Sequence, residues 1–167
     1  SDILIFQYYI GARRNFFLMS SENSNLQVKD IMTKGVAYMD STETVEKAAK
    51  TMSQYKVGSI IIMDNFIAVG IVTERDLVRR ILAEDKPAST KVKEIMSSPL
   101  VVISPDESVS ELAQLMMDRK IHKVPVLEPP VKQESRLVGI VTATDLIRFA
   151  SKGSESKMTD IINQIYL

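Results

Sequence analysis

The residues that could bind a ligand occur twice, at two points where a predicted strand runs directly into a predicted helix. The first junction is Gly70-Ile71-Val72-Thr73-Glu74-Arg75-Asp76 and the second is Gly139-Ile140-Val141-Thr142-Ala143-Thr144-Asp145. A helix that begins there presents backbone N–H groups and the positive end of its dipole, which favours a phosphate or another anion. The aspartate repels a phosphate, but its carboxylate accepts two hydrogen bonds from a vicinal diol such as ribose. Thr and Asp at this spacing therefore suit a nucleotide better than a bare phosphate.

The same residues also have a purely structural interpretation. Thr followed three residues later by Asp, before an apolar run, is the pattern of a capping box, in which the Thr caps the helix and the Asp reaches back to it. Because a helix follows both junctions, the duplication does not decide between ribose binding and capping.

The junctions belong to an internal repeat, which organises most of the chain. Val28-Lys29-Asp30-Ile31-Met32 reappears as Val92-Lys93-Glu94-Ile95-Met96, and the junction reappears in the same order. The register is constant except in 128–135, where extra residues and Pro129-Pro130 indicate a lengthened loop.

Each copy predicts the order strand, helix, strand, strand, helix. In the first copy we expect strands at Val36–Met39, Ser59–Met63 and Ala68–Val72, a turn at Asp64-Asn65 and a closing helix at Glu74–Leu82. In the second copy we expect strands at Leu100–Ile103, Lys123–Leu127 and Arg136–Val141 and a closing helix at Ala143–Ala150.

The first helix of each copy has an apolar face at helical spacing. In the second copy the helix is predicted to start at Ser104-Pro105-Asp106-Glu107, where Ser104 is the cap, Pro follows it and Glu comes three residues after it. In the first copy Asp40 and Glu43 occupy the corresponding positions. The residues of this face are Val45, Ala48, Ala49, Met52 and Tyr55 in one copy and Val109, Leu112, Ala113 and Met116 in the other.

We predict the α/β class with an α+β arrangement: two β-α-β-β-α repeats related by a pseudo-twofold axis and packed through their sheets and helices. A unit of this size buries too little apolar surface to be stable alone, so the copies should share a core and form two equivalent clefts where they meet. The predicted divisions are an N-terminal extension (1–27), the first repeat (28–85), a linker (86–91), the second repeat (92–150) and a C-terminal segment (151–167).

The two ends of the chain differ from the repeats. Residues 1–18 contain strongly apolar runs around Arg13-Arg14. They are interpreted either as an upstream extension foreign to the natural protein or as a genuine arm that packs on a neighbouring subunit. After a flexible Ser/Gly/Lys stretch, the C-terminal segment predicts an amphipathic helix. That helix could pack on its own core or mediate self-association; its apolar residues are Met158, Ile161, Ile162 and Ile165.

Composition excludes several classes of function. The 21 basic and 21 acidic residues cancel and the pI is about 6.6, so nothing favours nucleic acid. Cysteine is absent and His122 is the single histidine, which excludes thiolate and multi-histidine metal sites. No Ser/His/Asp set, paired-carboxylate cleft or glycine-rich phosphate loop occurs, and the longest apolar runs are too short to span a bilayer. We therefore expect a cytoplasmic protein without membrane attachment, catalysis or cofactor.

In its repeats the chain resembles a pair of CBS domains, a module found in cystathionine β-synthase, inosine monophosphate dehydrogenase, chloride channels and AMP-activated kinase. The resemblance covers about Val28 to Ala150. It rests on three motifs, each present twice in the same order: V-K-[DE]-I-M, the middle strand at Val57–Ile62 and Ile121–Val126, and G-I-V-T-x-x-D at the junctions.

This resemblance implies a tandem pair that binds AMP, ADP, ATP or S-adenosylmethionine in two clefts. The junction Asp would hold the ribose, the Thr and the residue before the Asp would lie near ribose and phosphate, and the other copy's backbone would read the adenine. One cleft would hold Thr73, Arg75 and Asp76 with Val101, Ile121, His122 and Lys123. The other would hold Thr142, Thr144 and Asp145 with Ala37, Val57, Gly58 and Ser59.

The clefts should be unequal, because Arg75, His122 and Lys123 offer three phosphate partners in the first and the second has few cations. Arg79-Arg80 and Glu111 are interpreted as solvated helix faces. We expect a sensor of adenine nucleotides that forms a homodimer and acts on an unidentified partner protein through ligand-dependent geometry. The alternative is a structural or assembly module with empty clefts.

Overall fold

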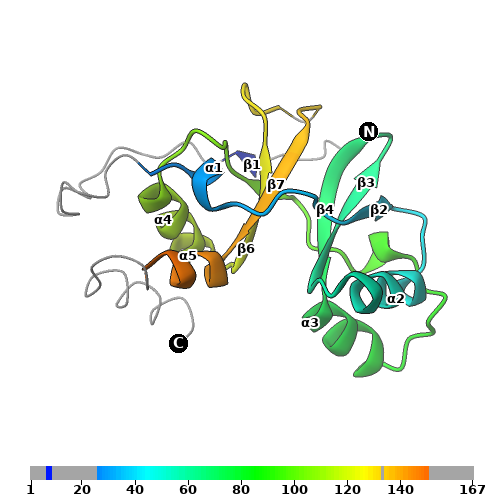
Figure 1. Cartoon of the computed structure of the whole chain (residues 1–167). Helices are drawn as coiled ribbons and strands as arrows, with labels where there is room; N and C mark the ends of the chain where they lie inside the picture. The colour runs from blue at the N-terminus through cyan, green and yellow to red at the C-terminus, as the bar shows by residue number, and fades with distance from the viewer. Residues whose placement is uncertain (1–6, 9–25, 133, 151–167) are drawn as a thin grey trace. The chain divides into compact units, whose positions relative to one another are not determined.

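The computed structural model describes residues 7–8, 26–132 and 134–150 (Figure 1). Contacts divide the chain into two compact units. The first contains Val36–Val101, and the second contains, among the described residues, 26–35 and 102–150. The strand β1 (Gln7–Tyr8) is the other described element. The predicted N-terminal extension and C-terminal helix lie almost entirely outside the described residues.

The first unit is a three-stranded sheet covered by helices on one face (Figure 1). Strand β2 (Tyr38–Asp40) runs parallel to β3 (Ser59–Asp64), which forms an antiparallel hairpin with β4 (Ile67–Thr73). Helix α2 (Val45–Tyr55) connects β2 to β3, and α3 (Glu74–Leu77) continues into a π-helical turn (Val78–Leu82). A 3-10 turn (Val92–Glu94) completes the unit.

The core of the first unit lies between this sheet and its helices. Met52 of α2, Ile60 of β3 and Ile81 of the π-helical turn are all buried in one cluster, together with Val92 of the 3-10 turn. The hairpin turn after β3 lies at Asn65 and Phe66, one residue later than the predicted Asp64-Asn65, and both residues have positive φ values, 47° and 66°.

The second unit repeats the same order. Strand β5 (Val101–Val102), whose first residue is still counted in the first unit, leads to helix α4 (Val109–Arg119). The antiparallel hairpin of β6 (Lys123–Leu127) and β7 (Leu137–Thr142) and helix α5 (Ala143–Ala150) follow. Ile103 bridges to Val126 in the parallel sense, as Met39 pairs with Ile62 in the first unit. The predicted mixed α/β class and the duplicated strand–helix–strand–strand–helix order are therefore confirmed.

Each unit contains the opening segment of the other sequence repeat. Residues 26–33, which open the first repeat and include α1 (Val28–Ile31), belong to the second unit, whereas residues 90–97, which open the second repeat, belong to the first unit. The N–H of Val28 donates to the Glu107 carbonyl and the N–H of Val92 donates to the Glu43 carbonyl, both at 2.9 Å. The compact units thus differ from the sequence repeats by an exchange of opening segments.

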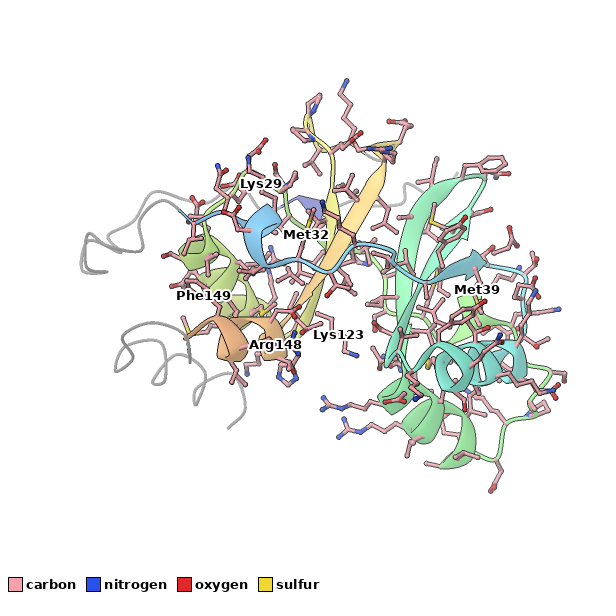
Figure 2. All side chains as sticks on the ribbon, in the orientation of Figure 1. Lys29, Met32, Met39, Lys123, Arg148 and Phe149 are labelled. Atoms are coloured by element: carbon pink, nitrogen blue, oxygen red, sulfur yellow. The ribbon has the colours of Figure 1, made fainter. Side chains whose placement is uncertain are left out.

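The exchanged segments explain why two of the sequence motifs occur together. Met96 of one opening segment crosses Gly70 of β4, and Met32 of the other crosses Gly139 of β7, with Met32 drawn beside β7 in Figure 2. A Cβ atom at either glycine would lie 2.6 Å from the methionine Sδ. The Met of V-K-[DE]-I-M and the Gly of G-I-V-T are therefore a packing pair.

Two details of the first helices differ from the sequence prediction. The helices begin at Val45 and Val109, after the caps Thr44 and Ser108, and not at the predicted caps. Ser104 instead holds a turn, because its Oγ accepts from the N–H of Asp106 at 3.2 Å. On α2, the predicted core residues Ala49 and Tyr55 are exposed.

Candidate functional site

The first junction forms where β4 ends at Thr73 and α3 begins at Glu74. Oδ2 of Asp76 accepts from the backbone N–H of Thr73 at 2.8 Å and from its hydroxyl at 3.0 Å, while Thr73 Oγ1 accepts from the N–H of Asp76 at 3.3 Å. The side chain of Asp76 is 13% exposed. This arrangement is a complete capping box.

The second junction repeats this geometry within a few tenths of an ångström. Oδ2 of Asp145 accepts from the N–H of Thr142 at 2.8 Å and from its hydroxyl at 3.0 Å, and Thr142 Oγ1 accepts from the N–H of Asp145 at 3.2 Å. The side chain of Asp145 is 9% exposed. The structural interpretation of both Thr–Asp pairs is thereby confirmed, and both carboxylates turn toward their own helix ends.

The helix ends have fewer open N–H groups than an anion site built on them would use. The first helical N–H, that of Glu74, donates to the Gly58 carbonyl at 3.1 Å, and that of Ala143 donates to the His122 carbonyl at 2.8 Å. The third helical N–H at each junction is the one held by the threonine. Two of the first three amides therefore have a protein partner, which weakens the backbone contribution to phosphate binding that the sequence predicts.

The second oxygen of each junction carboxylate lies near an arginine of the same helix. Asp76 Oδ1 is 3.5 Å from Arg80 Nε, and Asp145 Oδ1 is 3.6 Å from a terminal nitrogen of Arg148. Figure 2 labels Arg148 on α5, at the same end of the sheet as Lys123. At each junction, Oδ1 of the aspartate therefore lies outside the capping box and faces the guanidinium group of an arginine.

Arg80 makes a further contact that sequence reasoning missed. Its terminal nitrogen donates to the Ile95 carbonyl at 2.7 Å, and the Met96 carbonyl lies at 3.5 Å. Arg80 is exposed, as its interpretation as part of a solvated helix face predicts, but it also makes these two contacts. The spacing of Asp76 and Arg80 on one helix face could have indicated the ion pair. Nothing local in the sequence indicates the contact with 95–96.

The structure brings each junction beside the middle strand of its own unit. Ser59 pairs with Thr73, and Lys123 pairs with Thr142. Of the predicted site residues, eight lie in the first unit: Ala37, Val57, Gly58, Ser59, Thr73, Arg75, Asp76 and Val101. The others lie in the second unit: Ile121, His122, Lys123, Thr142, Thr144 and Asp145. The predicted assignment of His122 and Lys123 to the Asp76 ligand stays a prediction.

The part of the chain that the structure describes has neither a metal site nor a membrane span. No group of three or more histidine, cysteine or acidic side chains is arranged to hold a metal ion there. No helix in these ranges is long and apolar enough to cross a membrane.

Two strand–helix–strand–strand–helix units, each closed by a capped strand-to-helix junction, define a tandem α/β repeat module. The family model described as "CBS domain" matches the sequence twice, over residues 28–83 and 92–152. The chain therefore belongs to the CBS domain family, as its motifs predict.

Similar proteins include a curated relative and solved structures. The chain is 33% identical to the CBS domain-containing protein YhcV of Bacillus subtilis over 139 residues, which are 82% of this chain and 96% of that one. It is 31% identical, with a TM-score of 0.67, to the CBS domain pair of protein MJ0100 in complex with 5-methylthioadenosine and S-adenosyl-L-methionine, covering 76% of this chain and 98% of that one. A hexameric CBS-CP12 protein from bloom-forming cyanobacteria is 30% identical with a TM-score of 0.66, covering 81% and 79%.

Proposed function

We propose that this chain is a regulatory module that binds an adenosine-containing ligand at its two junctions and has no catalytic activity of its own. One observation carries the proposal: both junctions keep one aspartate oxygen, Oδ1, outside the capping box. The likeness to a CBS pair crystallised with two adenosine derivatives supports the same ligand class. AMP, ADP, ATP and S-adenosylmethionine are the candidates.

The capping box and ribose binding are compatible in this proposal. Oδ2 stays in the cap, and Oδ1 accepts from the ribose hydroxyls, which replaces part of the ion pair with arginine. Because Oδ1 is the acceptor that matters, Asp and Asn differ sharply at this position: Asn retains an oxygen for the cap but presents an amide N–H₂ donor to the diol.

Isothermal titration calorimetry with AMP, ATP and S-adenosylmethionine tests the proposal. Asp76→Asn and Asp145→Asn should each weaken one binding event by roughly ten- to hundredfold, as expected for a lost charge-assisted hydrogen bond. Glu111→Gln is a matched control, because it changes a capping-box carboxylate on another helix and should leave affinity unchanged. Unaltered affinity in both Asp variants would contradict the proposed site.

The two junctions are proposed to differ in their preference for charge. Arg75 precedes Asp76 whereas Thr144 precedes Asp145, so phosphorylated ligands should bind more tightly at the first junction. We further propose that His122 and Lys123 serve the Asp76 ligand. Lys123→Ala, combined separately with Asp76→Asn and with Asp145→Asn, tests this by double-mutant cycles. Coupling with Asp145 alone would assign Lys123 to the junction of its own unit.

The alternative function is a structural module without a ligand. A ligand present at about 100 times its Kd should raise the free energy of unfolding by about 2.7 kcal/mol. No thermal shift with any of the candidate ligands would favour the structural module.

We also propose that the module works as a homodimer whose geometry depends on ligand. Light scattering and small-angle scattering with and without AMP will test this proposal.

A further inference from the structure

We propose that Arg80 is a positioning residue that couples the carboxylate of Asp76 to the opening segment 90–97, so that a ligand on Asp76 loosens that segment. The inference rests on the proposed function, because it assigns a structural consequence to ligand binding at the first junction. The residues that carry it all lie in the first unit.

Arg80 is shared between two acceptors on different parts of this unit. Its Nε lies 3.5 Å from Oδ1 of Asp76, and its terminal nitrogen donates to the Ile95 carbonyl at 2.7 Å. Asp76 is held in place by its capping box, and its side chain is 13% exposed, whereas that of Arg80 is 45% exposed. The anchored carboxylate therefore fixes the arginine, and the arginine in turn holds the segment.

The opening segment pairs with β4 directly after the two carbonyls that Arg80 contacts. Beyond Met96, Ser97 exchanges two backbone hydrogen bonds with Ile71 of β4, at 2.9 and 3.2 Å. Met96 itself lies against Gly70 in the same strand. A weaker Arg80 contact at Ile95 and Met96 should therefore be detected at the amides of Ser97 and Ile71.

The second junction has no arginine at the position of Arg80. The repeat places Phe149 at the position of Arg80, and Arg148 approaches Asp145 from another turn position. Phe149 carries no donor for a carbonyl of the segment 26–33. The coupling should therefore be specific to the first junction, although both have the same capping box.

Ligand binding should act through competition for Oδ1. A ribose diol that donates to Oδ1 occupies the lone pairs that face Arg80, and the arginine loses the group that fixes it. Since the ion pair is partly exposed, the effect is modest, roughly two- to fivefold in an equilibrium constant. Linkage requires the reverse effect as well: loosening the segment must strengthen ligand binding by the same factor.

Hydrogen exchange followed by NMR on the full chain tests this coupling, with Asp145→Asn as background so that AMP just sufficient to saturate the first junction leaves the weakened second junction mostly empty. Without ligand, Arg80→Gln should speed exchange at Ser97 and Ile71 about two- to fivefold. Saturating AMP should speed exchange at Ser97 and Ile71 by a similar factor when Arg80 is present. In Arg80→Gln, AMP should cause no further increase in these exchange rates. Arg79→Gln is the matched control, since Arg79 is the exposed residue directly before Arg80. This variant should change neither the exchange rates without ligand nor the response of these rates to AMP.

A second measurement tests the reciprocal effect. Met96→Ala removes the side chain that seats the segment on Gly70, and it should raise AMP affinity two- to fivefold when Arg80 is present and leave it unchanged in Arg80→Gln.

The outcomes separate this inference from the proposed function. If AMP binds but exchange at Ser97 and Ile71 is the same with and without it, the coupling is wrong and the ligand site stands. If ligand-free Arg80→Gln exchanges like the background protein, the coupling is also wrong. If no adenosine ligand binds at either junction, the proposed function fails and the coupling fails with it.

Discussion

Gly70 and Gly139 show how a single missing side chain permits the close approach of two segments. A Cβ atom at Gly139 would meet Met32 Sδ at 2.6 Å and the Thr33 carbonyl oxygen at 3.0 Å. The methionine can move, but the backbone oxygen is fixed by its hydrogen bond from Ile140. We expect Gly139→Ala to lower the free energy of unfolding by about 2 kcal/mol through overpacking, measured by urea denaturation.

A double variant separates overpacking from a general effect of alanine. Met32→Ala removes the flexible part of the contact, so Gly139→Ala should cost less in that background than in the natural sequence. Additive costs would show that the overpacking is not against Met32 and would assign it to the Thr33 carbonyl oxygen, which both variants retain. The same pair of variants at Gly70 and Met96 repeats the test in the other unit.

The sequence predicts the junction residues better than it predicts their roles. Thr73 and Asp76 stand out from their types and spacing, but the same spacing fits a cap and a ribose ligand, and only the three hydrogen bonds between them establish the cap. The pairing of Met96 with Gly70 was not predicted, because it joins positions of two motifs that are distant in the sequence.

At the scale of the element, helix α4 depends on a capping box that includes an ionisable group. Glu111 Oε2 accepts from the N–H and hydroxyl of Ser108, both at 3.1 Å. A hydrogen bond with Glu107, together with those from Ser108, lowers the pKa of Glu111 from its usual 4.5, although burial opposes the shift. The interpretation of Glu111 as an ordinary solvated charge was wrong.

The lowered pKa gives α4 a pH dependence of defined sign. The folded state holds the Glu111 proton more weakly than the unfolded state, so the stabilisation is complete above the unfolded pKa of about 4.5 and is lost as pH falls through the lower folded value. Glu111→Gln should cost about 1 kcal/mol at pH 7, and this difference should shrink as pH falls toward 3. Urea denaturation of both proteins across that range measures it, and a difference independent of pH would contradict the assignment.

The hairpin strands and closing helices were predicted well because their patterns are local, whereas β2 begins two residues later than predicted and β5 is shorter than predicted. The bounds of β6 and α5 match the prediction, and the turn at Asn65 follows from residue type. The starts of α2 and α4 were placed too early because Asp40 and Ser104 are also good caps. The turn residues that follow Ser104 are needed by the opening segment, since the carbonyls of Pro105 and Glu107 accept from Lys29 and Val28.

At the scale of the whole molecule, the repeats of the sequence and the units of the structure are different divisions of the chain. The sequence divides at Val28 and Val92, where each motif series begins, whereas contacts place each opening segment in the unit of the other repeat. Periodicity reveals that a segment exists and is apolar on one side. It does not reveal which of the two similar hairpins, β3–β4 or β6–β7, the segment joins, because the corresponding strands β4 and β7 offer the same backbone hydrogen-bonding groups.

The exchange of opening segments predicts that damage to one repeat weakens the other unit. Val28 and Val92 are both fully buried, and truncation of either to alanine should cost about 2 kcal/mol. Val28→Ala should speed hydrogen exchange at Ile140 and Val109 of the second unit, whose amides donate to the carbonyls of Thr33 and Leu26. Val92→Ala should speed exchange at Ile71 and Val45 of the first unit, whose amides donate to the carbonyls of Ser97 and Thr90. Each variant is the control for the other. If Val28→Ala instead speeds exchange at Ile71 and Val45, the segments are not exchanged, and the units coincide with the sequence repeats.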